Sequence, residues 1–359
     1  MTDLLDPGAE LYDRIAVVDV GPGGATGLRV SSYDAGELET GEGLRVAFDV
    51  QKTIQSDVNK AKIQIHNLSA ESRSRIAKGD VVRLRVGYAS TPLELAYEGE
   101  VTRVVSERAG PSIITTIEAG DGVETFKAQD AKATFPAGTK VRTVIEAVAK
   151  KFTEAIRDEV RTPVSYGKAP PKKKPSRLST RNLDRDLAAL ETSLTAQGFA
   201  TTLRRALSIA GNAREAMDAM GRQWRFLWSV QDGAIQIVAY GAALVGEAIL
   251  LSPDSGLLGI PAPLDFGVKL TSRIIPGLRP GTAIVLRAST LSGKYIAESV
   301  HMTGDTRRQE WTAEIEARNM EGTAITVLSS DTTTTAASSG PSQESADSIR
   351  SAGQQAGVL

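Results

Sequence analysis

The chain has 359 residues, which is enough for two or three domains with separate hydrophobic cores. Its 42 lysines and arginines balance 43 aspartates and glutamates, so the net charge of -1 creates no overall field toward DNA or an anionic membrane. The absence of cysteine excludes disulfides, thiolate nucleophiles and cysteine-ligated zinc. The two histidines, His66 and His301, are too few for a histidine zinc site on one chain. We expect no cofactor, and a metal would need carboxylates or a second subunit.

The N-terminal residues, MTDLLDPGAELYDR, lack the basic and apolar regions of a secretion signal. No window approaches the roughly 18 apolar residues that cross a bilayer. The sequence therefore predicts a protein that is made and kept in the cytoplasm until it is assembled, without membrane insertion.

Residues 1–26 are expected to form an N-terminal arm. Its apolar run at residues 15–20, IAVVDV, suits an edge strand or an arm that docks on a neighbour. The GPGGATG that follows lacks the Gly-Lys-Ser/Thr ending of a P-loop, so we interpret it as a plain loop.

Residues 27–122 alternate apolar and polar side chains with a period of two, which is typical of half-buried strands. Ser69 is placed to cap one short helix among them. Turn residues at short spacing separate at least five expected antiparallel strands. The pattern predicts a small β-barrel or sandwich.

Residues 123–249 change to helical spacing and are expected to form an α+β domain. Thr139, Asn182 and Asn212 are the predicted helix N-caps. A hairpin is expected to turn at residues 232–233, Asp-Gly. The tryptophans before it could form a carbohydrate platform, but we favour core packing for them.

A Pro- and Lys-rich linker, residues 163–181, interrupts this middle domain. It is expected to be a solvated loop without regular structure. The alternative is weak phosphate contact through Lys172, Lys173 and Lys174, although Tyr166 is the only aromatic residue nearby for base stacking.

Residues 250–327 return to alternating strands and repeat part of the first β-domain. GDVVRLR at residues 79–85 aligns with GTAIVLR at residues 281–287, and ITTIEA at residues 114–119 aligns with TAEIEA at residues 312–317. Two matches in the same order indicate a duplicated β-domain. The last segment, residues 328–359, is a low-complexity tail that is expected to be disordered by itself.

The fold class predicted is therefore mainly β: two similar small β-barrel domains flank an α+β domain, and a flexible tail follows. Glu298, His301 and Asp305 form the one compact titratable cluster in this pattern. Their spacing on a hairpin does not suit the matched acid and base of a glycosidase. The sequence also lacks H-E-x-x-H, G-x-S-x-G and a cysteine nucleophile, so we expect no enzyme.

The sequence resembles a known family over two stretches. Residues 46–88, which begin VAFDVQKTIQSD, and residues 97–122, which begin YEGEVTRVVSER, resemble the first β-domain of tail hub proteins of contractile-tailed bacteriophages. These are the Mu-like baseplate hubs of the late control protein D superfamily. Residues 293–317 resemble the second β-domain of that family, with His301, a Gly-Asp turn at residues 304–305 and Trp-Thr at residues 311–312.

The resemblance implies a structural virion protein in the tail baseplate that is assembled in the host bacterial cytoplasm. Such hubs are homotrimeric symmetry adaptors: two β-domains in each of three chains present six similar surfaces to the sixfold tail tube, while the threefold ring meets the central spike. The implied partners are the tail tube protein or its terminating ring, the spike, the tape-measure protein and the baseplate wedge. DNA would pass only transiently through the channel.

Two alternatives stay open. Some tail hubs or spikes carry a lysozyme or peptidase domain, which would make the chain a tail-associated peptidoglycan hydrolase. The spike-hub component of a type VI secretion system shares the hub fold.

Two loops occupy equivalent places in the two copies, residues 107–113 and residues 302–310. We predict that both lie at ring contacts. The residues predicted to touch a neighbouring subunit or the tube are Glu107, Arg108, Ser112, Asp305, Arg307, Arg308 and Gln309.

Overall fold

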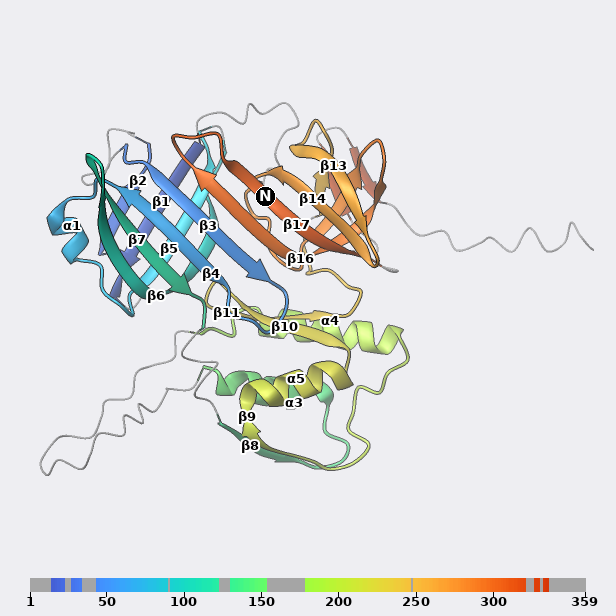
Figure 1. The fold of residues 1–359 in the computed structure, drawn as a ribbon. Coiled ribbons are helices and arrows are strands. Elements are labelled where there is room, and N and C mark those ends of the chain that lie inside the picture. Colours follow the sequence, from blue (N-terminus) through green and yellow to red (C-terminus); the bar gives the residue numbers. More distant parts are fainter. Residues whose placement is uncertain are drawn as a thin grey trace, which may run out of the picture.

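The computed structural model describes residues 14–22, 27–33, 43–89, 91–122, 130–153, 178–246, 248–320, 326–329 and 332–335. Its strands form one long sheet, and a smaller α+β domain lies along one side of that sheet (Figure 1). The mainly β class predicted from the sequence is confirmed. The domain boundaries drawn from the sequence stay predictions.

The first β-domain is a seven-stranded part of the sheet in the order β3-β4-β7-β6-β5-β1-β2. Alternating apolar side chains form it, because successive residues of a strand point to opposite faces. Its elements are β1 (Arg14–Gly21), β2 (Leu28–Ser31), β3 (Val46–Thr53), β4 (Lys60–His66), α1 (Ala70–Ser74), β5 (Val81–Tyr88), β6 (Glu94–Ala109) and β7 (Ser112–Gly120).

The apolar run near the N-terminus is a central strand. β1 pairs with β5 on one side and with β2 on the other, so the prediction of an edge strand or a docking arm is wrong. The physical reason is Asp19, which is 3% exposed and accepts hydrogen bonds from Arg29 of β2 and Arg85 of β5. This carboxylate joins all three strands.

The second β-domain continues the same sheet in the order β13-β14-β17-β16, with β15 on β16 and β12 on β15. A short hairpin, β18 with β19, follows in the region expected to be a tail. The elements are β12 (Ile249–Leu251), β13 (Leu257–Leu264), β14 (Gly267–Arg273), β15 (Ala283–Arg287), β16 (Ser292–Asp305), β17 (Trp311–Asn319), β18 (Thr326–Ser329) and β19 (Thr332–Thr335).

The two β-domains are not closed barrels in the described part of the chain. β16 pairs with β3, so the strands of both domains form one open 13-stranded sheet. One hydrophobic cluster spans both domains, from Ala16 in β1 to Ala317 in β17. The prediction of two barrels fails because alternation predicts a half-buried strand but does not say which strand lies beside it.

The middle domain has a separate core between helices and two small two-stranded sheets. Its elements are β8 (Asp130–Phe135), α3 (Val141–Lys151), α4 (Leu183–Ala196), β9 (Leu207–Asn212), α5 (Ala213–Gln223), β10 (Phe226–Gln231) and β11 (Ala234–Ala239). The α+β prediction is therefore confirmed.

The predicted helix caps have mixed outcomes. The side chains of Ser69 and Asn212 do cap α1 and α5. Asn182 occupies the N-cap position of α4 without a side-chain hydrogen bond. Thr139 is wrong as a cap, because its hydroxyl donates to the Pro136 carbonyl and Lys140 is the N-cap of α3.

The predicted turn at Asp232 joins β10 to β11, and Asp232 and Gly233 both have positive φ, as a tight hairpin requires. Trp228 is 3% exposed, and its ring centroid lies 5.2 Å from that of Phe152. The prediction of core packing for this tryptophan is confirmed.

A buried charged cluster joins this hairpin to the long sheet. The Lys52 ammonium in β3 donates to both Asp232 carboxylate oxygens, at 2.7 and 2.8 Å. Asp121, just after β7, accepts from the backbone N–H of Gly233. Burial and then the Asp232 charge raise the Asp121 pKa to about 8, although Lys52 and that backbone N–H act in the opposite direction. The Asp121 carboxyl is therefore neutral over much of the pH range in which a surface aspartate is charged.

We predict that Asp121 makes the protein less stable as pH rises. Its ordinary pKa is 3.8, so between pH 4 and 8 the folded state keeps a proton that the unfolded chain has already released. This contribution to the unfolding free energy is complete below pH 4 and declines by at most about 1.4 kcal/mol per pH unit until pH 8.

Asp121→Asn keeps the shape and removes this proton. Calorimetry at pH 5 and pH 8 should show the variant gaining stability relative to the parent protein as pH rises, by on the order of a few kcal/mol. Parallel pH profiles for the two proteins would contradict the buried neutral carboxyl.

Candidate functional site

The duplication predicted from the sequence is present in the strand pairing. Val81 lies opposite Glu100, and its counterpart Ala283 lies opposite Ile296. In the next ladder the register shifts between Val101 and Arg103 in β6, and between Ala297 and Ser299 in β16. The extra residue therefore falls at the same place in both copies. Ladders that agree in register and in irregularity are strong evidence for a structural repeat.

The two copies are joined by antiparallel pairing between the second half of β16 and the whole of β3. The pairing runs from Ser299 opposite Thr53 to Asp305 opposite Ala47. Backbone bonds extend it at both ends: the Ile54 N–H donates to the Glu298 carbonyl and the Thr306 N–H to the Val46 carbonyl. We call this pairing the internal junction.

Side chains reinforce the internal junction at one end. The Arg45 guanidinium, just before β3, donates to both Asp305 oxygens, with Nε at 3.1 and 3.2 Å. Burial raises the pKa of Asp305, but the hydrogen bonds from the Arg45 side chain and the Arg307 backbone N–H, together with the Arg45 and Arg308 charges, outweigh it, and the net pKa is lowered. The Asp305 carboxylate is therefore charged and held in place.

Aromatic packing covers the same end of the internal junction. The Trp311 ring in β17 meets Phe48 of β3 edge-on, with centroids 5.3 Å apart, and meets Tyr88 of β5 at 6.3 Å. Gly304 lies below them, where an added Cβ would come 2.3 Å from the Phe48 ring. The β16–β17 tip thus fits tightly against the first β-domain.

The structure separates the predicted contact residues into two groups. Asp305 is only 3% exposed, and its carboxylate is bound by Arg45 within the chain. Arg307, Arg308 and Gln309 are exposed at the β16–β17 tip, beside the internal junction. Arg307 donates to the Gly43 carbonyl, and the Arg308 carbonyl accepts from Arg14.

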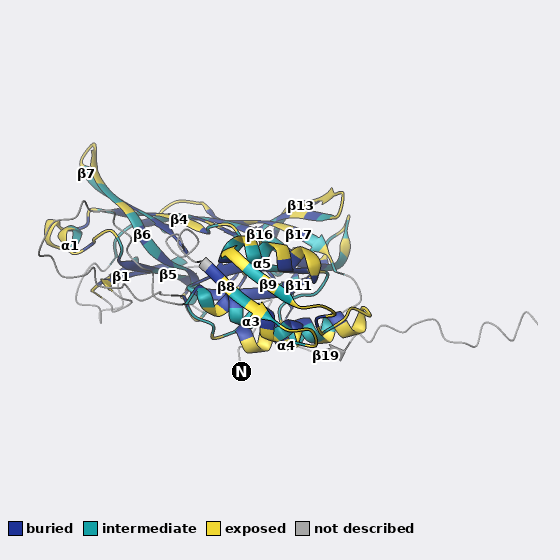
Figure 2. Cartoon of the chain, turned by 90° about the horizontal axis from the view of Figure 1, so that it is seen from below, coloured by how far each residue is buried: buried dark blue, intermediate teal, exposed yellow. Residues whose placement is uncertain are grey.

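Glu107, Arg108 and Ser112 lie at the other hairpin tip, between β6 and β7. Glu107 and Arg108 are exposed and Ser112 is partly exposed. This tip extends beyond the body of the sheet (Figure 2). Contact with another subunit at either tip stays a prediction. Lys172, Lys173 and Lys174 lie outside the described residues.

Sequence reasoning missed two unpaired strand edges. The second half of β6, residues 102–109, pairs with β7 on one side, and no other described strand pairs with it on the opposite side. The first half of β6 pairs with β5, as the first half of β16 pairs with β15. The unpaired half of β6 is therefore the counterpart of the half of β16 that pairs with β3.

The second unpaired edge is β13, at the far end of the sheet (Figure 1). It pairs with β14 only, within the part of the chain that is described. Ile260 and Leu264 of β13 are 76% and 47% exposed, and Phe266 in the following turn is 80% exposed. An apolar, unpaired edge is a binding surface for another strand. The signal in the sequence was LLGIPAPLDFG, where apolar residues continue without polar alternation.

The titratable cluster suggested by the sequence is dispersed in the fold. Glu298 pairs with Arg318, Asp305 with Arg45, and His301 lies 3.0 Å from the Asp49 carboxylate. Glu298 and Asp305 therefore each hold an arginine and do not face one another as an acid and base.

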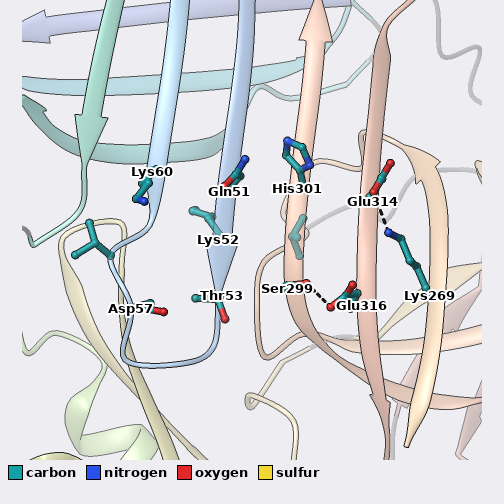
Figure 3. Close-up of a pocket in the computed structure, with 12 residues that line it drawn as sticks. Gln51, Lys52, Thr53, Asp57, Lys60, Lys269, Ser299, His301, Glu314 and Glu316 are labelled. Carbon is teal, nitrogen blue, oxygen red and sulfur yellow. Dashed lines mark hydrogen bonds and ion pairs between the residues drawn. The ribbon is translucent and has the colours of Figure 1, made fainter. Parts of the chain in front are cut away.

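His301 also borders an open groove of about 680 Å³ across β3, β16, β17 and β14 (Figure 3). Its charged side chains have both signs, with Lys60 and Lys269 against Glu314 and Glu316. Lys269 is paired with Glu314 at 3.3 Å. Because its lining carries charges of both signs, the groove would not select a ligand by the charge of that ligand.

Over the described ranges there is no group of three or more His, Cys, Asp or Glu side chains that could hold a metal ion. No helix in those ranges is long and apolar enough to cross a membrane.

Comparison with known proteins gives structural matches only. No protein-family model matches the sequence, and no curated protein matches it. The 43 kDa tail protein of prophage MuSo2 from Shewanella oneidensis is similar in structure, with 10% identity and a TM-score of 0.49 over 85% of this chain and 98% of that one.

Two other solved structures are similar to this chain. The tail protein from Neisseria meningitidis MC58 has 7% identity and a TM-score of 0.48 over 85% of this chain and 96% of that one. The c3393 protein of E. coli, a type VI secretion component described as similar to T4 tail proteins, has 10% identity and a TM-score of 0.45 over 84% and 78%.

We predict that the Arg45 to Asp305 contact holds the internal junction together. Asp305→Asn should lower the unfolding free energy by about 1.5–3 kcal/mol, because it removes charge-assisted hydrogen bonds to a partly buried arginine. Gln309→Ala, at an exposed position on the same tip, is the matched control and should change stability by less than about 0.5 kcal/mol. Urea unfolding measures both. Equal changes in the unfolding free energy for the two substitutions would show that the Asp305 carboxylate does not stabilise the internal junction.

Proposed function

We propose that this chain is a structural protein of a contractile phage tail, the baseplate hub that joins the tail tube to the central spike. Three chains would form a ring in which six β-domains surround a channel. The ring would present six similar surfaces to the sixfold tube and keep threefold symmetry for the spike. The tail tube protein or its terminating ring, the spike, the tape-measure protein and the baseplate wedge are the partners that we propose.

One observation carries this proposal: the chain contains two β-domains with the same ladder register, joined edge to edge. The internal junction makes a continuous strip of sheet from two equivalent units. A ring of identical chains with two equivalent domains each has twice as many similar surfaces as chains. That geometry is what an adaptor between sixfold and threefold parts requires.

The polar face of the strip supports a channel. Glu118, Lys62, Asp49 and Thr303 lie directly opposite one another along β7, β4, β3 and β16, so one polar face crosses the internal junction without a break. The other face is the common hydrophobic core. We place the polar face toward the channel.

Charge on this face suits the transient passage of DNA. Acidic and basic side chains are interspersed, and several are paired, as Arg103 is with Glu118 and Lys269 with Glu314. Tight DNA binding needs an excess of lysine and arginine against phosphate. A balanced face would let the polyanion slide through without being held.

Neither alternative gains a specific observation. The carboxylates that a peptidoglycan hydrolase would have used, Glu298 and Asp305, are each bound to an arginine. A type VI hub would also be a trimer. The two possibilities are therefore distinguished by whether the chain is found in a phage tail or in a type VI secretion system.

We predict that the purified protein, or the protein in intact particles, has a mass of about three times 38.0 kDa per ring. Light scattering over a concentration series and native mass spectrometry measure it. A chain that stays monomeric inside an intact tail would contradict the hub proposal.

Peptidoglycan zymography tests the hydrolase alternative. We expect no clearing by the parent protein. Clearing that disappears on Glu298→Gln or Asp305→Asn, and persists with Gln309→Ala, would replace the structural proposal with a hydrolase.

A further inference from the structure

We propose that two open edges of the chain bind each other in different copies: β13 of one chain pairs with residues 102–109 of β6 in the next. The contact would repeat the internal junction between chains. This inference rests on the proposed function only for the number of copies that close the ring. The contact itself is argued from the two edges.

The two open edges are equivalent to the two strands of the internal junction. β6 matches β16 and β13 matches β3 by their places in the two copies, since β3 pairs with β4 as β13 pairs with β14. The chain therefore uses one pairing, β16 with β3, and leaves the counterpart strands β6 and β13 unpaired among its described residues. These two edges lie at opposite ends of the strip, so they cannot meet within one chain (Figure 1).

The equivalence also sets a register. In the internal junction His301 lies opposite Gln51. His301 lies opposite Glu314 in β17, and Val105 lies opposite Thr116 in β7. Thr116 and Glu314 are aligned in the two copies, so Val105 is the counterpart of His301.

The counterpart of Gln51 follows in the same way. Gln51 lies opposite Lys60 in β4, and Leu264 lies opposite Gly267 in β14. Val105 of one copy should therefore lie opposite Leu264 of the next. The exposed Leu264 would gain a cross-strand neighbour.

The backbone of β13 gives the contact a direction. Pro263 is the counterpart of Val50. Alternate residues of a strand direct their backbone groups at the same neighbouring strand. Val46 and Ile54 direct theirs at β16, so Val50 does the same. Pro263 has no N–H, so the outward edge of β13 can accept a hydrogen bond there but cannot donate one.

This polarity selects the partner. Two β13 edges placed together would both lack a donor at Pro263, whereas β6 can donate its own N–H groups from residues 104, 106 and 108. A β13 edge therefore favours a β6 edge over a copy of itself. Unlike edges that bind head to tail produce rings, while like edges produce twofold dimers. The proline thus disfavours the dimer that would compete with a ring.

Engineered cysteines test the register, because the chain has none of its own. The double variant Val105→Cys, Leu264→Cys should form disulfides between chains under mild oxidation and run as covalent oligomers that end at three chains. Facing positions in a non-hydrogen-bonded pair have Cβ atoms about 4.5–5.5 Å apart, close to the spacing that a disulfide needs.

Two matched controls accompany this variant. Gln51→Cys with His301→Cys occupies the same positions in the internal junction, so it should form its disulfide within one chain and run as a monomer. Val105→Cys with Lys269→Cys moves one cysteine to β14, one strand away from the edge, and should not cross-link.

The outcomes separate this inference from the proposed function. A trimer by mass that forms no disulfide in the double variant would overturn the edge pairing and leave the hub. Dimers from Leu264→Cys alone would show like edges in contact and would also overturn it. A protein that is monomeric by mass both in solution and in particles, with no cross-link, would overturn both.

A second variant needs no disulfide. Leu264→Lys places an ammonium opposite the apolar Val105 of the next copy, two residues from Arg103, and because Leu264 is 47% exposed, the effect on folding should be small. The protein concentration at which half of the trimer dissociates should rise about tenfold or more. Val245→Lys, at another exposed apolar position, is the control and should leave it unchanged. An unchanged concentration for Leu264→Lys would contradict the pairing.

Discussion

The pairing of β16 with β3 is the interaction on which the rest of the structure depends. It turns two similar β-domains into one strip with a common core and a common polar face. It uses one edge from each domain and leaves the matching edge of each domain unpaired among the described strands. Unpaired edges are usually protected in soluble proteins. Here they are complementary, and Pro263 restricts which strand each can accept.

The middle domain is held to this strip by buried charge as well as by packing. Lys52 of β3 and Asp232 of the β10–β11 hairpin form an ion pair that is almost fully buried. Breaking such a pair by removing one partner is costly, because the remaining charge stays buried. Asn59 adds a donor to the Val230 carbonyl in the same place. These contacts fix the orientation of the hairpin, since Asp232 also accepts from the Glu98 N–H and Asn59 also donates to Gln231.

Local patterns in the sequence predicted local structure well. The alternation in β3 and β4, the Asn212 cap and the Asp232 turn each depend on neighbouring residues, and the structure confirms them. The repeat at Gly79 and Gly281 predicted the duplicated unit. What could not be predicted joins residues far apart: Arg45 with Asp305, or β3 with β16. Period-two patterns do not say which edge a strand will meet, so the single sheet and its two open ends required the structure.

The central claim is that six copies of one β-meander, two from each of three chains, line a single channel. An image reconstruction of the assembled particle by electron cryo-microscopy tests this most directly. The account predicts three chains, with the β6 edge of each beside β13 of the next and a continuous sheet around the channel. Chains that meet through the middle domain, with β6 and β13 both facing solvent, would contradict it.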